Sequence, residues 1–436
     1  MFTRKLATLA ILFIPFILLS ALFIPASAIP TQSGTQLTFL PLIQTSPICN
    51  VPGDYATIQS ALDRPGCAII NLTAPLYIEN LAINRDVAIH GQGAAHTVLD
   101  GNANGNVVTI QAGWTVTITH LTVRNGCDDY YCSDIELGGG ITNEGSHVFL
   151  EHLMVEDNES IGIFNKNPGT MNINDSIIRR NYWGVLNGGH VVINNSTISH
   201  NQVLTQTVDG GGIANNGVMY LNNSAVHHNG GGNNGGISNY HAMTITNSTI
   251  HDNEGSNFGG IFTGGTLHIY NSTISSNYSH DDGGGIYNTS LDPEIINSLT
   301  IINSTIANNI ARHGGGIYGG FNLTVTNSII ANNFAEVTGG DCLIGGAISL
   351  GHNLDSDGSC NLTGTGDISG VDPLLGSLKA NGGPTWTHAL SPNSPAIDAG
   401  SNANCLDTDQ RGVTRPIDGD GNGSAICDIG AYEYQP

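Results

Sequence analysis

A seven-residue phrase of the form N-S-T-I-x-x-N recurs along this chain at a spacing close to 24 residues. Its first residues are Asp175, Asn195, Asn223, Asn247, Asn271, Asn303 and Asn327, separated by 20, 28, 24, 24, 32 and 24 residues. Each phrase follows an alternating apolar run such as "VMYLN" or "MTITN", the period-two pattern of a strand with one buried face. A repeat of this length, with about three short strands and no helical half, predicts one coil of a parallel β-solenoid.

Another asparagine stands six residues after each phrase start. These residues are Asn181, Asn201, Asn229, Asn253, Asn277, Asn309 and Asn333, and Asn158 fits the same frame. Equivalent residues of successive coils lie about 4.8 Å apart, and a buried amide can bond to the amides above and below it. We therefore expect asparagine ladders, with Ser and Thr bonding to turn backbone and Gly allowing tight corners. Many of these phrases are also N-x-[ST] sequons, but a ladder explains their spacing without glycosylation.

The N-terminus has the order of a secretory signal peptide. Two basic residues precede an apolar run from Leu6 to Pro25, and the small-residue sequence "ASA" ends at Ala28. We expect residues 1–28 to be a cleaved signal and residues 29–48 to be a linker. The alternative is an uncleaved membrane anchor, because the apolar run is long. Beyond this segment we expect no contact with a membrane.

The charge balance narrows the class of partner. Without the signal, 10 basic residues remain against 35 acidic ones, a net charge of about −25. Phosphates would be repelled by such a chain, so nucleic acid is excluded as an expected partner. Cations and neutral glycans fit the composition better.

Eight cysteines in an exported chain predict disulfides. Proximity along the chain favours the pairs Cys49 with Cys67, Cys127 with Cys132, Cys342 with Cys360, and Cys405 with Cys427. A metal–thiolate site is the alternative, but the chain has no paired C-x-x-C spacing to support one.

These features resemble the right-handed parallel β-helix, or pectin-lyase-like, family. The stretch "DYATIQSALD" (Asp54 to Asp63) resembles the short helix that covers the first coil in that family, with Asp54 as its N-cap. The stretches "VAIHGQG" and "LTVRNG" resemble its early coils. The resemblance implies an all-β fold over residues 49–370, a right-handed parallel β-helix of about a dozen coils with an N-terminal capping helix.

Residues 371–436 are similar to a module called the choice-of-anchor Q domain, which occurs on exported bacterial β-helix proteins. The similar stretches are "VDPLLGSL", "NGGPTWTHAL", "SPAIDAG", "DQRGVTRP" and "CDIGAYEY". The segment breaks the 24-residue period and is rich in Pro and Asp turns. We therefore expect a C-terminal cap that covers the open edge of the last coil.

One group of candidate site residues comes from aligning the coils on their glycine clusters. The alignment places Asp281 next to Arg312, and Asp282 next to His313, one coil away. Two carboxylates beside a cation and an imidazole can bind a metal or act on a sugar acid. The alternative is an exposed ion-pair cluster on a turn, with no chemical role.

Two further stretches of polar residues lie where side chains can meet a ligand. The early loop "CDDYYCSDIELGGG" offers Asp128, Asp129, Tyr130 and Tyr131 as ligand-binding candidates at the corner where coil length varies. A second column lies five residues after the phrase starts and contains Arg180, His200, His228 and Asp252. His227 and His251 stand one position earlier in their coils. Histidine-rich stripes can bind metals, and solvated outward-facing strand residues are the alternative.

The run Asp418-x-Asp420-x-Asn422-Gly matches the front half of a calcium-binding loop. Its closing acid is missing, because Ile429 stands in that position and Asp428 is only adjacent to it. Calcium is thus the one cofactor that the sequence suggests. An Asp/Gly turn that caps its own backbone is the alternative.

Catalytic motifs are scarce. The resemblance implies that lyases of this class use clustered calcium-binding acids and an arginine base, for which Arg124 in "LTVRNG" is available, although that phrase is also an ordinary coil signature. The "NTD" and "RIK" motifs of the related hydrolases are absent.

We expect a secreted or cell-surface bacterial protein that binds carbohydrate, such as a polysaccharide or a surface glycan, and has no identifiable catalytic machinery. The alternatives are a calcium-dependent lyase of acidic polysaccharides, using Asp281, Asp282 and Arg312, and a surface adhesin.

Overall fold

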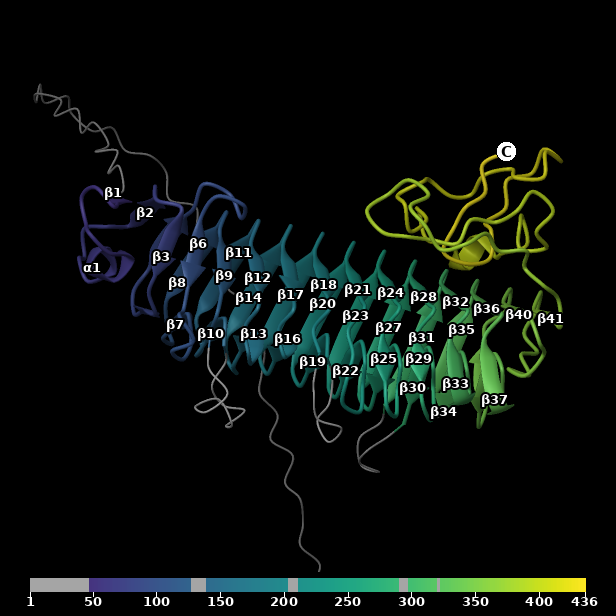
Figure 1. Ribbon diagram of the computed structural model, residues 1–436. Coiled ribbons are helices and arrows are strands. Elements are labelled where there is room, and N and C mark those ends of the chain that lie inside the picture. The colour runs from purple at the N-terminus through teal and green to yellow at the C-terminus, as the bar shows by residue number, and fades with distance from the viewer. Residues whose placement is uncertain (1–46, 127–138, 203–210, 290–296, 320–321) are drawn as a thin grey trace, which may run out of the picture. The chain divides into compact units, whose positions relative to one another are not determined.

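Strands of successive coils pair in parallel in the described residues from 48 to 369 (Figure 1). The computed structural model describes residues 47–126, 139–202, 211–289, 297–319 and 322–436. Each coil contributes one strand to each of three long sheets, and a fourth, short sheet joins them in the later coils. The expected all-β parallel β-helix of about a dozen coils is confirmed.

The sheets are named here in the order in which the chain passes through them in one coil. The first sheet contains β1 (Ile48–Val51), β2 (Ile69–Leu72), β5 (Val87–His90), β8 (Thr115–Thr119), β11 (His147–Glu151), β14 (Thr170–Asn174), β17 (His190–Asn194), β20 (Val218–Asn222), β23 (Ala242–Thr246), β27 (Thr266–Tyr270), β31 (Ser298–Ile302), β35 (Leu323–Thr326) and β39 (Ala347–Ser349). The second sheet contains β3 (Leu76–Ile78), β6 (Val98–Asp100), β9 (Thr122–Arg124), β12 (Met154–Glu156), β15 (Ile177–Arg179), β18 (Thr197–Ser199), β21 (Ala225–His227), β24 (Thr249–His251), β28 (Thr273–Ser275), β32 (Thr305–Ala307), β36 (Ile329–Ala331), β40 (Leu354–Asp355) and β41 (Ile368–Ser369). The short sheet contains β25 (Glu254–Gly255), β29 (Tyr278–Ser279), β33 (Ile310–His313) and β37 (Phe334–Thr338). The third sheet contains β4 (Leu81–Ile83), β7 (Val108–Ile110), β10 (Ile141–Asn143), β13 (Ile161–Asn165), β16 (Trp183–Asn187), β19 (Ile213–Asn215), β22 (Ile237–Asn239), β26 (Ile261–Thr263), β30 (Ile286–Asn288), β34 (Ile317–Gly319) and β38 (Cys342–Ile344).

The alternating runs form the first sheet as expected. In β20 the side chains of Met219 and Leu221 are buried, whereas Tyr220 between them is exposed. Leu221 lies in register with Ile193 of the coil before and with Ile245 of the coil after, so apolar columns fill the interior. Burying one such side chain contributes about 1.5–3 kcal/mol, which makes these columns the main source of stability.

The predicted asparagine ladder runs between the second and third sheets. From Asn158 to Asn333, each Nδ2 donates to the Oδ1 of the next coil at 2.8–3.0 Å. The backbone N–H of each residue donates to that same oxygen, as at Asn253 and Asn277. Asp341 ends the ladder, where its Oδ1 accepts both bonds from Asn333. Every donor in this buried column therefore has an acceptor.

The phrase starts do not form this ladder. They adopt positive φ angles between 44 and 50° at the turn from the first to the second sheet, a conformation that Asn and Asp tolerate better than most residues. The serine that follows each start accepts a backbone N–H from the coil before and donates to a carbonyl two residues earlier, as Ser224 does. A second asparagine ladder lies at the end of the third-sheet strands and runs through Asn143, Asn165, Asn187, Asn215 and Asn239.

Helix α1 (Ile58–Leu62) covers the first coils with the buried side chains of Ile58 and Leu62. Its N-cap is Thr57, not Asp54 as expected, because Asp54 instead accepts the backbone N–H of Asn50. No helix of the described residues is long and apolar enough to cross a membrane.

Three of the four expected disulfides are present in the described residues. They join Cys49 to Cys67, Cys342 to Cys360, and Cys405 to Cys427. The expected pair of Cys127 and Cys132 lies outside the described residues, as do the expected signal peptide and most of the linker.

Residues 371–436 consist mainly of turns, with isolated antiparallel bridges and the 3-10 helix η1 (Asn402–Asn404). They pack along the outer side of the second sheet, not only over the last coil as a cap would. Gln410 donates to the hydroxyl of Thr249 and accepts from the hydroxyl of Thr273, one coil further on. An apolar cluster that includes Ile329 and Ile429 continues the contact at the last coils.

Candidate functional site

The short sheet brings together the two residue pairs that the coil alignment predicted. Nη1 of Arg312 lies 3.6 Å from Oδ1 of Asp281, and Nδ1 of His313 lies 3.0 Å from Oδ1 of Asp282. Arg312 and His313 end β33, and both donate their backbone N–H to the carbonyl of Asp281. The β-helix register thus fixes these side chains as neighbours across two coils.

The two pairs differ in exposure. The side chains of Arg312 and Asp281 are 55% and 50% exposed, whereas those of His313 and Asp282 are 24% and 22% exposed. The outer pair is therefore screened by water and contributes little to stability. The inner pair is held against the protein and keeps a defined geometry.

Two tyrosines lie beside the inner pair, and the sequence reasoning missed them. Tyr287 of β30 and Tyr318 of β34 are in register, and their rings stack with centroids 5.0 Å apart. Burial, together with the nearby charges of Asp282 and Asp281, raises the pKa of the Tyr318 hydroxyl. Burial also raises the pKa of Tyr287, next to the charges of Tyr318 and Asp282. The sequence "GGGIY", which ends at Tyr287 and again at Tyr318, could have indicated that the two rings lie next to each other in successive coils.

Glycine is required where the chain turns from the acids to these tyrosines. Gly283 and Gly314 have φ angles of 59 and 60°, and a Cβ atom on either would lie 2.8 Å from the Cβ of the following tyrosine. An L side chain at these positions would be strained and would push the ring away. The glycine cluster therefore places Tyr287 and Tyr318 beside the charged residues.

We call Asp281, Asp282, Tyr287, Arg312, His313 and Tyr318 the acid–aromatic cluster. Phe258 packs against Tyr287 with ring centroids 4.0 Å apart, so the cluster also has an apolar surface. Carboxylate and imidazole atoms of Asp281, Asp282 and His313 lie within 4.8 Å of one another, close enough to share a cation. The cluster thus offers acceptors, donors and an apolar surface on one exposed side of the stack.

The candidate calcium loop folds as a turn whose carboxylates bond to backbone. Asp418 accepts the N–H groups of Gly421 and Gly423, and the Asn422 amide donates to Asp420. Oxygens of Asp418 and Asp420 lie within 4.8 Å of a carboxylate oxygen of Asp398, a residue that the sequence reasoning did not consider.

Asp428 is not one of the three carboxylates in this group. It is buried and accepts the N–H groups of Asp398 and Tyr434. Burial, together with the charge of Glu433, raises its pKa to about 7.

The remaining ligand-binding candidates lie beyond the part of the chain that the structure describes. These are Asp128, Asp129, Tyr130 and Tyr131 in the early loop.

A stripe of charged and imidazole side chains follows the outer side of the second sheet. Arg124, considered above as a lyase base, forms an ion pair with Asp100 at 2.9 Å. Arg180 pairs with Asp157 at 2.7 Å and, through this hydrogen bond, lowers the pKa of that carboxyl. Along the stripe, His200 stacks on His228 with ring centroids 5.0 Å apart. The histidine column of the sequence is therefore a continuous row of neighbouring rings.

Comparisons with known proteins concern the fold. No protein-family model matches the chain, and no curated protein matches its sequence. Among solved structures, pectate lyase Pel9A is similar with 15% identity over 87% of this chain and 91% of that chain, at a TM-score of 0.44. The Dettilon tailspike protein gp208 has 14% identity over 73% and 67%, at 0.42. The A-module of the Azotobacter vinelandii mannuronan C-5 epimerase AlgE4 has 16% identity over 73% and 92%, at 0.34. The likeness is limited to the parallel β-helix that the sheet topology already establishes.

Proposed function

We propose that this protein is exported and binds carbohydrate at the acid–aromatic cluster. The observation that carries the proposal is the juxtaposition of Asp282, His313 and Tyr318 on one exposed side, with Asp281 and Arg312 at its rim. Sugar hydroxyls need both donors and acceptors, and their carbon faces need apolar contact, all of which this cluster supplies. Because the coils fix these side chains before a ligand arrives, little ordering entropy is lost on binding.

Binding is favoured over catalysis by the setting of the charged groups. A general acid or base works best where water is excluded, and the side chains of Arg312 and Asp281 are half exposed and paired with each other. Asp281, Asp282 and His313 can hold a cation, so a calcium-dependent polysaccharide lyase is the second candidate. A surface adhesin remains a third.

Export is supported by two features of the chain. The three disulfides of the described residues are typical of an oxidising compartment. The order of residues 1–28 is that of a signal peptide. Detection of the mature chain outside cells expressing the full gene would test this; retention in the cytoplasm would contradict it.

We also propose that residues 371–436 are a choice-of-anchor Q-like module of a bacterial surface protein. The motifs that suggested the resemblance supply the residues that contact the β-helix. Trp386 accepts at its carbonyl from the Thr249 hydroxyl, and the backbone N–H of Gly430 donates to the Asn327 carbonyl. Cell fractionation of the native host tests surface retention, and a freely diffusing protein would argue against it.

The test of carbohydrate binding uses residues 29–436 and a panel of acidic and neutral polysaccharides, each with and without calcium. Binding is followed by calorimetry, and elimination by absorbance of the unsaturated sugar that a lyase creates. We expect binding without product, and at least about tenfold weaker affinity for Asp282→Asn and Tyr318→Phe, about 1.4 kcal/mol.

The matched control removes another ion pair of the stack, Lys166 with Glu144 at 3.0 Å, through a double alanine variant that should bind normally. Product formation would make the protein a lyase. Absence of both signals across the panel would refute carbohydrate binding and favour an adhesive or structural role.

A further inference from the structure

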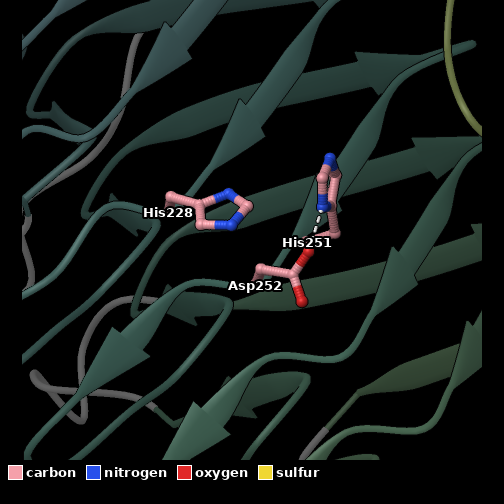
Figure 2. A group of neighbouring side chains, drawn as sticks. All are labelled: His228, His251 and Asp252. Carbon is pink, nitrogen blue, oxygen red and sulfur yellow. Dashed lines mark hydrogen bonds and ion pairs between the residues drawn. The ribbon is translucent and has the colours of Figure 1, made fainter.

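A histidine cluster lies on the second sheet at the edge of the region that residues 371–436 cover. It contains His227 and His251, which end β21 and β24 in register, and the two residues that follow them, His228 and Asp252. His228 and Asp252 have φ angles of 53 and 51°, so both coils leave the sheet by the same turn. The parallel stack therefore places His251 and Asp252 one coil further on than His227 and His228. Figure 2 shows His228, His251 and Asp252.

Three of these residues offer ligand atoms that lie close to one another. A nitrogen of His228, a nitrogen of His251 and a carboxylate oxygen of Asp252 all lie within 4.8 Å of one another. Nδ1 of His251 lies 2.7 Å from Oδ2 of Asp252, as the dashed line in Figure 2 shows. The His251 side chain is buried and the Asp252 side chain is 41% exposed, so the group is anchored on one side and open on the other.

Neighbouring rings hold the two imidazoles in place. Nδ1 of His227 lies 2.8 Å from Nδ1 of His228, which leaves Nε2 of His228 to bind a ligand. His251 is stacked by His227, with centroids 4.8 Å apart, and by Trp386, with centroids 5.2 Å apart. A metal-ligating histidine usually has its second nitrogen hydrogen-bonded in this way, because that bond fixes the ring orientation.

We propose that His228, His251 and Asp252 form a binding site for a divalent transition metal such as Zn²⁺. Two imidazole nitrogens and one carboxylate oxygen suit zinc, whereas calcium and magnesium prefer sites made only of oxygen. His227 positions His228 without binding the metal. The exposed side leaves a fourth coordination position for water or an exogenous ligand.

The test titrates metal-free full-length protein with ZnCl₂ in a calorimeter. We expect about one ion bound per chain and a change in the fluorescence of Trp386, which stacks directly on a ligand. That fluorescence change should disappear in Trp386→Phe while zinc binding remains. X-ray absorption at the zinc edge should show imidazole ligands, and CaCl₂ in excess should not displace the zinc.

The informative variants are His228→Ala and Asp252→Asn, because both side chains are exposed and their replacement leaves the core intact. We expect each to weaken zinc binding at least about tenfold, or about 1.4 kcal/mol. The matched control is His152→Ala, which removes one ring of another pair of neighbouring histidines, His120 and His152, whose centroids lie 4.6 Å apart. No stoichiometric zinc binding by the unaltered protein, or equal binding by both cluster variants, would overturn the proposal.

Discussion

At the scale of single residues, the amides of the ladder from Asn158 to Asn333 are buried and hydrogen-bonded to the coils on both sides. Asn253 illustrates this, since its Nδ2 donates to Asn277 and to the carbonyl of Val226 and its Oδ1 accepts from Asn229. Removing this amide takes partners from donors and acceptors in both neighbouring coils. A buried polar group left unpaired costs about 1–3 kcal/mol, so a ladder position is more sensitive than a single hydrogen bond would suggest.

Asn253→Ala should therefore lower the free energy of unfolding by about 3 kcal/mol, measured as a shift of the urea midpoint. The control is Asn195→Gly, because Asn195 is exposed and has a φ of 49° that glycine adopts easily. That control should change stability by less than about 0.5 kcal/mol. Similar losses in the two variants would show that the ladder has no special importance.

A second residue-scale prediction concerns pH and Asp355, at the end of the second sheet. Burial, with the charges of Asp341 and Asp357, raises its pKa from 3.8 to about 7. The folded state therefore holds the proton more tightly than the unfolded state. The resulting stabilisation is complete below pH 3.8 and is lost as the pH rises towards about 7.

Thermal unfolding between pH 4 and pH 8 checks this, with Asp355→Asn as the comparison. Asn cannot ionise, so the variant should lose less stability than the unaltered protein as the pH rises. Parallel pH profiles for the two proteins would contradict the assignment.

At the scale of elements, periodic features were predictable and contacts distant in sequence were not. The spacing of the phrases identified the strands, the ladder and the neighbours of Asp281 and Asp282. It did not identify Trp386 as the stacking partner of His251, because no pattern links residues that far apart in the chain. For the same reason, the sequence did not indicate that residues 371–436 also contact the side of the stack, where Gln410 bonds to Thr249 and Thr273.

The lateral contact of residues 371–436 leads to a prediction at this scale. Gln410→Ala removes buried hydrogen bonds to Thr249, Thr273 and Thr385 in a single change. We expect faster hydrogen exchange in residues 371–436 and in the second-sheet strands β24 and β28, with early coils such as β8 and β11 unchanged. Uniformly faster exchange over the whole chain would instead mean that the segment and the stack unfold as one unit.

At the scale of the whole molecule, each coil contacts only its neighbours, so stability is built up along one axis. Two features stabilise the first coils, at the N-terminal end of this axis. Helix α1 covers them, and the disulfide between Cys49 and Cys67 joins β1 to the chain just after that helix. If this end is destabilised, we expect the first coils to unfold before the later ones.

The double variant Cys49→Ala/Cys67→Ala tests that expectation. A disulfide closing a loop of this size contributes about 3 kcal/mol, so the strands from β1 to β5 should exchange hydrogen faster than the same strands in the unaltered protein. Coils after β20 should keep their protection. A single cooperative loss across all coils would show that the stack does not behave as a chain of neighbouring units.

The asparagine ladder also has a direction. Between its side chains, every Nδ2 donates to the next coil toward the C-terminal end, and Asp341 receives the last pair of bonds with a carboxylate, which has no N–H to pass on. The second oxygen of Asp341 is already occupied by Ser356 and Asp357. The row of side-chain amides is therefore closed within one chain. It ends at a carboxylate that accepts bonds on both of its oxygens, before the strands β38 to β41 complete the described coils.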